Sequence, residues 1–168
     1  LDAEVARRTI TLYAPSKTFN LAGLQFAFAV IPDGELRKRF RRAGRGLGSW
    51  AGLFGQLGAL AAYRDSRDWL AEVLEYLQGN RDYLFDFVKA ELPGVRMHLP
   101  EATYLGWLDF RQTPLAHDPY TILLEQARVA MNAGKTFGPG GEGFVRLNFG
   151  CPRRTLEEAL QRIRKIFT

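Results

Sequence analysis

The chain has 168 residues, of which 46% are hydrophobic and 24% are charged, a composition typical of a folded, soluble protein rather than a disordered one. Cys151 is the only cysteine, which excludes an internal disulfide and favours a reducing cytoplasm. No apolar run is long enough to cross a bilayer. The start, Leu1-Asp2-Ala3-Glu4, is neither a signal peptide nor an initiator methionine, so we expect a truncated or cleaved chain.

The net charge of +5 comes largely from one basic run, residues 37–42, with Arg45 beyond it. Such a run is typical either of a patch for nucleic acid or of a solvated helix face. No recognition motif accompanies the run. We therefore expect a solvated face, and neither a nucleic-acid nor a membrane partner.

Two short apolar runs, residues 10–13 and 26–31, predict strands on either side of Lys17. A Pro32-Asp33-Gly34 turn ends the second run, and a basic helix is expected from about Glu35. A lysine on the turn between two buried strands has little role as a solubilising charge. We therefore interpret Lys17 as a reactive amine.

Small residues dominate the next segment, residues 46–60, in which Ser49 is a plausible N-cap for a helix. Glycines recur there at spacings of three and four, at Gly48, Gly52, Gly55 and Gly58. Because glycine costs about 1 kcal/mol in a helix interior, we interpret this stripe as a packing surface. A membrane dimer motif is the alternative, in a run that is short and bounded by arginines.

A long amphipathic helix is expected to open at Ser66-Arg67-Asp68 and to end at Pro93-Gly94, with a kink or break at Gly79-Asn80. Its apolar positions fit a period of 3.6 residues: Trp69, Leu70, Val73, Leu74, Leu77, Leu84, Phe87 and Val88.

Short strands and turns follow this helix. The expected elements are strands over residues 95–99 and 104–110, a helix from Asp118-Pro119 to about Arg128, a strand over 129–132, a glycine-rich loop, a strand over 144–149, and a last helix with a capping box at 155–158. The pattern predicts an α/β first part, a long connecting helix and a small α+β second part.

Two side chains are candidates for chemistry. A free lysine has a pKa near 10.4, and partial burial of Lys17 would lower that pKa towards the neutral amine needed for a Schiff base. Arg146 shares one strand face with Phe144 and Asn148, where a guanidinium needs an anionic partner. That partner is either a bound carboxylate or a local acid such as Glu142.

Other groups are expected to be structural. The glycine loop lacks a Gly-Lys-Ser/Thr ending and does not open a helix, so it is not a phosphate loop. His98 and His117 have no ligand-spaced partners, so we expect surface histidines and no metal site. Cys151, beside Pro152, is interpreted as a small apolar residue.

Three motifs occur in order along the chain: residues 14–25, residues 102–109, and Thr136-Phe137-Gly138 followed by residues 143–153. Together they strongly resemble fold-type I pyridoxal 5'-phosphate (PLP) enzymes, the aspartate-aminotransferase-like superfamily, and within it the MalY/PatB group of cystathionine β-lyases. The resemblance covers essentially the whole chain, but only the C-terminal part of such an enzyme. It implies the end of the large PLP-binding domain in residues 1–77 and the small domain in residues 78–168.

The resemblance also implies roles. Lys17 matches the lysine that forms the Schiff base with PLP and moves the substrate Cα proton, and Ser16 beside it is expected to bind the cofactor. Arg146 matches the arginine that holds the substrate α-carboxylate, and Tyr104 lies in a strand that approaches the substrate. Ala14 and Gln25 depart from a serine and an arginine common in the superfamily, so phosphate anchoring must rest on residues outside this chain.

The activity implied for the intact protein is α,β-elimination from an amino acid such as cystathionine, giving a thiol, pyruvate and ammonia. Transamination is the alternative, since it needs the same lysine and arginine. An alternative that is not an enzyme activity is that this chain is a truncated, catalytically incomplete C-terminal module. Family members are homodimers, so a cytoplasmic homodimer is expected of the intact protein.

Overall fold

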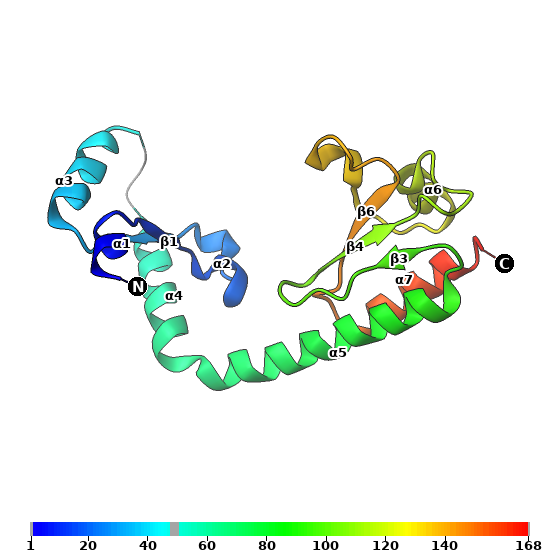
Figure 1. Ribbon diagram of the computed structural model, residues 1–168. Coiled ribbons are helices and arrows are strands. Elements are labelled where there is room, and N and C mark those ends of the chain that lie inside the picture. The colour runs from blue at the N-terminus through cyan, green and yellow to red at the C-terminus, as the bar shows by residue number, and fades with distance from the viewer. Residues whose placement is uncertain (1, 48–50, 168) are drawn as a thin grey trace. The chain divides into compact units, whose positions relative to one another are not determined.

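The computed structural model describes residues 2–47 and 51–167 and divides into two compact units, with the division between Glu72 and Val73 (Figure 1). The first unit contains the lysine turn and the basic segment. The second contains an antiparallel sheet with helices. Each unit is described by itself.

The first unit has two short strands around the lysine turn. Its elements are α1 (Ala3–Arg7), β1 (Thr11–Tyr13), α2 (Pro15–Thr18), the 3-10 helix η1 (Ala22–Leu24), β2 (Phe28–Val30), α3 (Gly34–Ala43) and α4 (Leu53–Asp65). β1 and β2 pair antiparallel, with Leu12 opposite Ala29. The predicted strands are therefore confirmed, although both are shorter than the apolar runs that indicated them.

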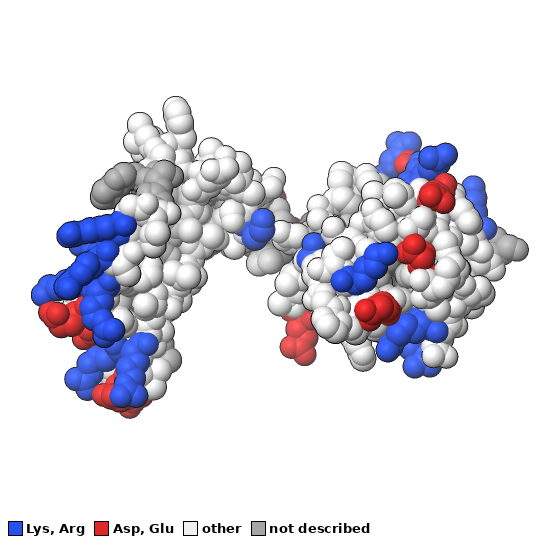
Figure 2. All heavy atoms as spheres, turned by 90° about the horizontal axis from the view of Figure 1, so that it is seen from above, with Lys and Arg blue, Asp and Glu red and all other residues white. Residues whose placement is uncertain are grey.

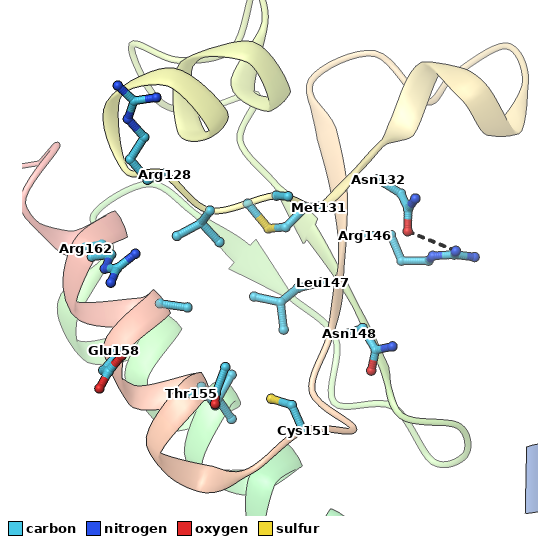
Figure 3. Close-up of a pocket in the computed structure, with 14 residues that line it drawn as sticks. Arg128, Met131, Asn132, Arg146, Leu147, Asn148, Cys151, Thr155, Glu158 and Arg162 are labelled. Carbon is cyan, nitrogen blue, oxygen red and sulfur yellow. Dashed lines mark hydrogen bonds between the residues drawn. The ribbon is translucent and has the colours of Figure 1, made fainter. Parts of the chain in front are cut away.

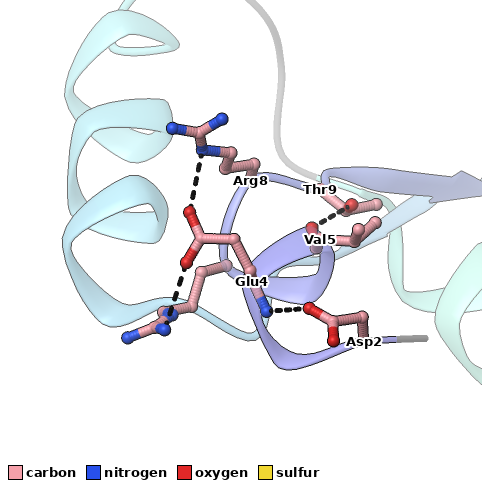
Figure 4. Close-up of polar contacts among 6 residues, drawn as sticks. Asp2, Glu4, Val5, Arg8 and Thr9 are labelled. Carbon is pink, nitrogen blue, oxygen red and sulfur yellow. Dashed lines mark hydrogen bonds and ion pairs between the residues drawn. The ribbon is translucent and has the colours of Figure 1, made fainter.

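Helix α1, which no sequence pattern indicated to us, is fixed by local contacts (Figure 4). Asp2 caps it by accepting a hydrogen bond of 2.7 Å from the Glu4 N–H. The Glu4 carboxylate lies 3.2 Å from the Arg7 guanidinium and 3.3 Å from that of Arg8. These ion pairs are exposed, so each stabilises the helix only slightly.

The basic segment forms the exposed helix α3, as expected. Asp33 begins it as N-cap, accepting from the Leu36 N–H at 2.7 Å. Figure 2 shows Lys and Arg side chains gathered along one side of the first unit. Lys38 pairs with Glu35 at 2.7 Å, while Arg37 donates to the Ile31 carbonyl at 2.7 Å.

The predicted stripe of small residues on α4 is a packing surface. A Cβ added at Gly55 would lie 2.8 Å from the Leu24 carbonyl oxygen, and one at Gly58 would lie 2.6 Å from Leu24 Cδ1. These glycines let the chain just after the lysine turn approach the helix backbone. Gly52 is instead the N-cap, with open space beside it, and Gly48 and Ser49 lie outside the described residues.

The first unit buries little apolar surface. Its buried hydrophobic side chains among the described residues are those of Ile31, Ala59 and Ala62, while Leu12 is 70% exposed and Phe54 is 77% exposed. Several large apolar side chains of this unit are thus exposed rather than packed in a core.

The second unit is built on a four-stranded antiparallel sheet with strand order β3-β4-β6-β5. The strands are β3 (Arg96–Met97), β4 (Leu105–Asp109), β5 (Asn132–Ala133) and β6 (Phe144–Asn148). The helices are α5 (Arg67–Glu91), which begins in the first unit, α6 (Pro119–Gln126) and α7 (Arg153–Arg164), and the 3-10 helix η2 (Gly134–Phe137) follows β5.

The core of this unit lies between the sheet and the helices α5, α6 and α7. Fully buried side chains from every one of these elements meet there: Leu84, Leu108, Leu123, Val145, Leu156, Leu160 and Ile163. The predicted apolar face is therefore confirmed for the last helix and for the C-terminal half of α5, where Leu84, Phe87 and Val88 are buried. Trp69 and Leu74, which the same period predicted to face inward, are exposed. No helix of the described residues is long and apolar enough to cross a membrane.

Helix α5 is not broken at Gly79-Asn80. Asn80 is buried and donates its amide N–H groups to the carbonyls of Phe149 at 2.9 Å and Cys151 at 2.8 Å. A polar residue in the helix interior is thus used to bind the end of β6 rather than to interrupt the helix.

The predicted capping box at 155–158 is wrong, because α7 begins earlier, at Arg153, with Pro152 as N-cap. The Tyr76 hydroxyl of α5 accepts a hydrogen bond of 2.6 Å from the Arg153 N–H. A side chain distant in sequence therefore satisfies a first-turn donor. The strand predicted over 129–132 is also shifted, since only Asn132 and Ala133 pair with β6.

Gly55→Ala is expected to destabilise the first unit by about 1–3 kcal/mol, because the new methyl would overlap the Leu24 carbonyl oxygen and the Phe26 Cβ. Denaturant titration gives the free energy of unfolding. The control is Gly23→Ala, whose methyl would meet nothing within 4 Å. Equal stability of the two variants would contradict the packing role of the stripe.

Candidate functional site

The lysine turn is a single helical turn, α2, fixed at both ends. Pro15 is buried at its first position, where the missing N–H and fixed φ suit a helix start. The Phe19 N–H donates to the Pro15 carbonyl at 2.9 Å. The Phe19 ring packs edge-on against Tyr63, with ring centroids 5.3 Å apart, and stacks on Trp69 at 6.4 Å. These contacts hold the turn that carries Ser16 and Lys17.

The Lys17 side chain is exposed and the Ser16 side chain is half-buried. The expected partial burial of Lys17 is therefore not found. The physical reason is that β1 and β2 form a two-stranded sheet whose side chains are largely exposed, so the described residues supply no layer that covers the amine. Neither side chain forms a hydrogen bond with the described part of the chain.

Arg146 lies in the middle of β6 with a neighbour on each side in the sheet. The register places it opposite Trp107 of β4 and opposite Asn132 of β5. The predicted alternation is confirmed, because Val145 and Leu147 are buried while Phe144, Arg146 and Asn148 are not. The sheet therefore presents Arg146 on the face opposite the core.

The Arg146 guanidinium has two described contacts and one donor without a partner. Its Nη2 donates to Asn132 Oδ1 at 3.0 Å (Figure 3), and its Cζ lies 4.5 Å from the ring centroid of Phe137. Its Nε is buried and has no hydrogen-bond partner among residues 2–47 and 51–167. A buried donor without an acceptor is costly, so this N–H is an unsatisfied group of the second unit.

Aromatic rings surround this arginine. Trp107 contacts Phe137 edge-to-face, with centroids 5.4 Å apart, and stacks on Phe144 at 5.5 Å. Phe137, Trp107 and Phe144 thus form an aromatic row. The Arg111 guanidinium lies over Phe144, with its Cζ 4.6 Å from the ring centroid. Sequence reasoning gave no role to Trp107, Asn132 or Phe137, although Trp107 and Phe137 lie in two of the three motifs.

The local acid considered as a partner for Arg146 makes a different contact. Glu142 Oε2 accepts a hydrogen bond of 3.0 Å from the Gly140 N–H. The described contacts of Arg146 are to an amide and an aromatic ring, both neutral. Its charge therefore remains available to an anion.

Tyr104 is half-buried and packs against the core cluster of the second unit. Its carbonyl accepts a hydrogen bond of 2.9 Å from the Phe149 N–H, and Gly150 lies close to its ring. Ser16 and Lys17 are thus together in the first unit, while Tyr104 and Arg146 belong to the second.

A hollow of about 440 Å³ lies on the other face of β6, between α7 and residues 128–132 (Figure 3). Leu147, Cys151 and Thr155 point towards it, whereas the side chains of Asn132 and Arg146 point away. Burial raises the pKa of the Cys151 thiol, which disfavours the thiolate needed for a nucleophile. The hollow therefore offers no activated thiol. Asn132 and Arg146 contribute to its lining, but their side-chain polar groups meet outside it (Figure 3).

Both histidines, His98 and His117, are exposed. Among the described residues, no group of three His, Cys, Asp or Glu side chains is arranged to hold a metal ion.

The chain matches the model of the aminotransferase class I and II family over residues 1–163. It is 40% identical to cystathionine beta-lyase PatB of Bacillus subtilis over 167 residues, covering 98% of this chain and 43% of the relative. It is 37% identical to protein MalY of Escherichia coli, covering 89% of this chain and 39% of that protein. The chain therefore belongs to the class I and II aminotransferase family.

Among solved structures, the chain is similar to cystalysin from Treponema denticola, which contains a pyridoxal 5'-phosphate cofactor. The TM-score is 0.90 and the identity 31%, covering 99% of this chain and 43% of cystalysin. The expected fold, part of the PLP-dependent transferase fold, is confirmed. The chain spans less than half the length of these relatives.

The ion pair beside this aromatic row gives a pH-dependent prediction. Asp109 accepts from the Arg111 Nε and Nη2, each at 2.9 Å, and from the Arg111 N–H. These hydrogen bonds hold the pKa of Asp109 below its usual value, although burial opposes them. The pair therefore stabilises the fold fully above about pH 4, and this stabilisation is lost as the pH falls through the lowered pKa.

Asp109→Asn is accordingly expected to reduce the loss of stability on acidification below about pH 4, measured as the free energy of unfolding against pH. The control is Asp86→Asn, an exposed carboxylate of α5 outside the ion pairs of the described residues. If the free energy of unfolding of Asp109→Asn fell on acidification as steeply as that of the wild type, the role of this pair would be contradicted.

Proposed function

We propose that the intact protein containing this chain is a PLP-dependent enzyme that acts on an amino acid by cleaving its C–S bond. The observation that carries the proposal is the Arg146 guanidinium, a cation whose hydrogen-bond partner and ring partner among the described residues are both neutral. Such a group suits the α-carboxylate of an amino acid. The similarity to PatB supports C–S lyase chemistry rather than another amino-acid reaction.

Lys17 is proposed to hold the cofactor, because its amine is exposed on a turn that Pro15 and Phe19 fix. The half-buried Ser16 hydroxyl beside it is a second proposed contact to PLP. When bound, PLP withdraws electrons from the substrate Cα. Ala14 and Gln25 offer neither a hydroxyl nor a cation to the phosphate, so its anchoring is assigned to the part of the relatives' length that this chain does not span.

The proposed roles during the reaction follow from these groups. Arg146 binds the α-carboxylate and so orients the Cα–H bond, while Tyr104 borders the substrate. The Lys17 amine takes the Cα proton as general base, and the thiolate leaves from Cβ. The products of this α,β-elimination from cystathionine are a thiol, pyruvate and ammonia. Water hydrolyses the amino group away from the three-carbon product.

We further propose that residues 1–77 close the large PLP-binding domain and residues 78–168 form the small domain of a cytoplasmic homodimer. The apolar surface exposed on the first unit supports this assignment, since a larger domain would cover it. With less than half of the relatives' length, the chain alone is expected to bind little PLP.

Lys17→Ala in the full-length protein is expected to abolish covalent attachment of PLP, because the reacting amine is removed. The measurement is borohydride reduction followed by peptide mass, which should show a pyridoxyl adduct on the Lys17 peptide of the wild type only. Lys38→Ala, an exposed lysine of α3, is the control and should keep the adduct. An adduct that persists in Lys17→Ala would refute the assignment.

Cystathionine with and without a 2-oxo acid separates elimination from transamination, the alternative suggested by the family. Pyruvate formation that is independent of the 2-oxo acid is expected. Strict dependence on it would show an aminotransferase instead.

A further inference from the structure

Two residues with no assigned role contact the Arg146 side chain: Asn132 of β5 and Phe137 at the end of η2. We propose that they are positioning residues, which hold the Arg146 guanidinium in the one orientation that binds a carboxylate in its plane. The inference rests on the proposed role of Arg146 and extends it to the residues that prepare it.

The sheet register brings Asn132 to the arginine. Asn132 lies directly opposite Arg146 in the β5–β6 pair, so the two side chains leave the sheet on the same face. The Asn132 Oδ1 accepts from Nη2 at 3.0 Å. One terminal N–H is thereby fixed in direction, and the flexible arginine side chain loses freedom before any ligand arrives.

The chemical type of this partner matters. An amide oxygen orients the guanidinium without neutralising it, whereas a carboxylate at the same position would form an ion pair and compete with an incoming anion. Among the described contacts of the Arg146 side chain none is to a carboxylate. The positive charge is therefore kept for a ligand.

Phe137 fixes the plane of the guanidinium. Its ring centroid lies 4.5 Å from Arg146 Cζ, a cation–π distance, so the ring covers one face of the guanidinium. Trp107 contacts the Phe137 ring edge-to-face, with centroids 5.4 Å apart. With one face covered, a ligand is directed to the N–H edges, where two parallel hydrogen bonds to a carboxylate can form.

The backbone segment that carries Phe137 is held in place by local hydrogen bonds. Phe137 ends the 3-10 helix that directly follows β5, and the Thr136 hydroxyl donates to the Ala133 carbonyl at 2.7 Å. The ring and the amide thus come from one short segment paired to β6. Both contacts leave the charge of the guanidinium without a counter-ion among the described residues.

The test uses propionate and propionamide, which have nearly the same shape, lack an amino group and differ in charge. Their dissociation constants are measured by ligand-detected NMR titration of the full-length, PLP-loaded protein. The readout is the preference for propionate, defined as the dissociation constant of propionamide divided by that of propionate. Wild type is expected to prefer propionate by about tenfold or more, as for a charge-assisted, bidentate contact.

Asn132→Ala and Phe137→Leu are each expected to lower this preference by about two- to tenfold, the effect of one hydrogen bond or one cation–π contact. Asn132→Asp should lower it further, because the new carboxylate neutralises Arg146. Phe137→Tyr keeps the ring and should retain the preference. Thr136→Ala alters the same segment without touching Arg146 and should retain it as well.

A merely structural role would weaken both probes equally and leave the ratio unchanged. Unchanged ratios in Asn132→Ala and Phe137→Leu, together with a ratio that collapses in Arg146→Gln, would overturn the positioning role while keeping the proposed function. An unchanged ratio in Arg146→Gln would refute the arginine's own role. If circular dichroism shows that Asn132→Ala does not fold, Asn132→Asp and Phe137→Leu decide the question.

Discussion

The pairing of β6 with a strand on each side is the constraint on which the second unit depends. Because side chains alternate along a strand, the burial of Val145 and Leu147 against the helices sends Arg146 to the opposite face. A shift of one residue in register would bury the guanidinium and expose the apolar side chains. The free energy of core formation therefore also determines where the Arg146 guanidinium lies and which residues stand beside it.

Features set by neighbouring residues could be predicted from the sequence. The apolar runs around Lys17, the alternation around Arg146 and the Asp118-Pro119 helix start all depend on local periodicity or on a cap within one turn. The small-residue stripe of α4 also kept its predicted role, because close backbone approach is a direct consequence of a missing Cβ. The motifs that contain Lys17 and Arg146 resemble one enzyme family, and the family match shows that the chain belongs to it.

Features set by residues distant in sequence could not be predicted. Burial of Lys17 would need further strands or helices packed over β1 and β2, and the described residues do not provide them. The apolar pattern around the lysine contains no information on such elements. Asn132 becomes a partner of Arg146 only through strand register, fourteen residues away along the chain. The sequence predicts a kink or break at Gly79-Asn80, whereas α5 continues through it. The two carbonyls that bind the Asn80 amide lie beyond β6, so residues near Asn80 in sequence could not indicate this contact.

The start of α7 has a consequence for how the second unit assembles. The sequence holds a local cap at Thr155, yet the helix begins at Arg153 because Tyr76 of α5 accepts the Arg153 N–H. In the separate segment only the local cap is available, so we expect its helix to begin at Leu156, three residues later. We therefore expect the first residues of α7 to become helical only when α7 docks on α5, in the arrangement that also has the Arg153 guanidinium over the Tyr83 ring. The length of α7 would then depend on its docking.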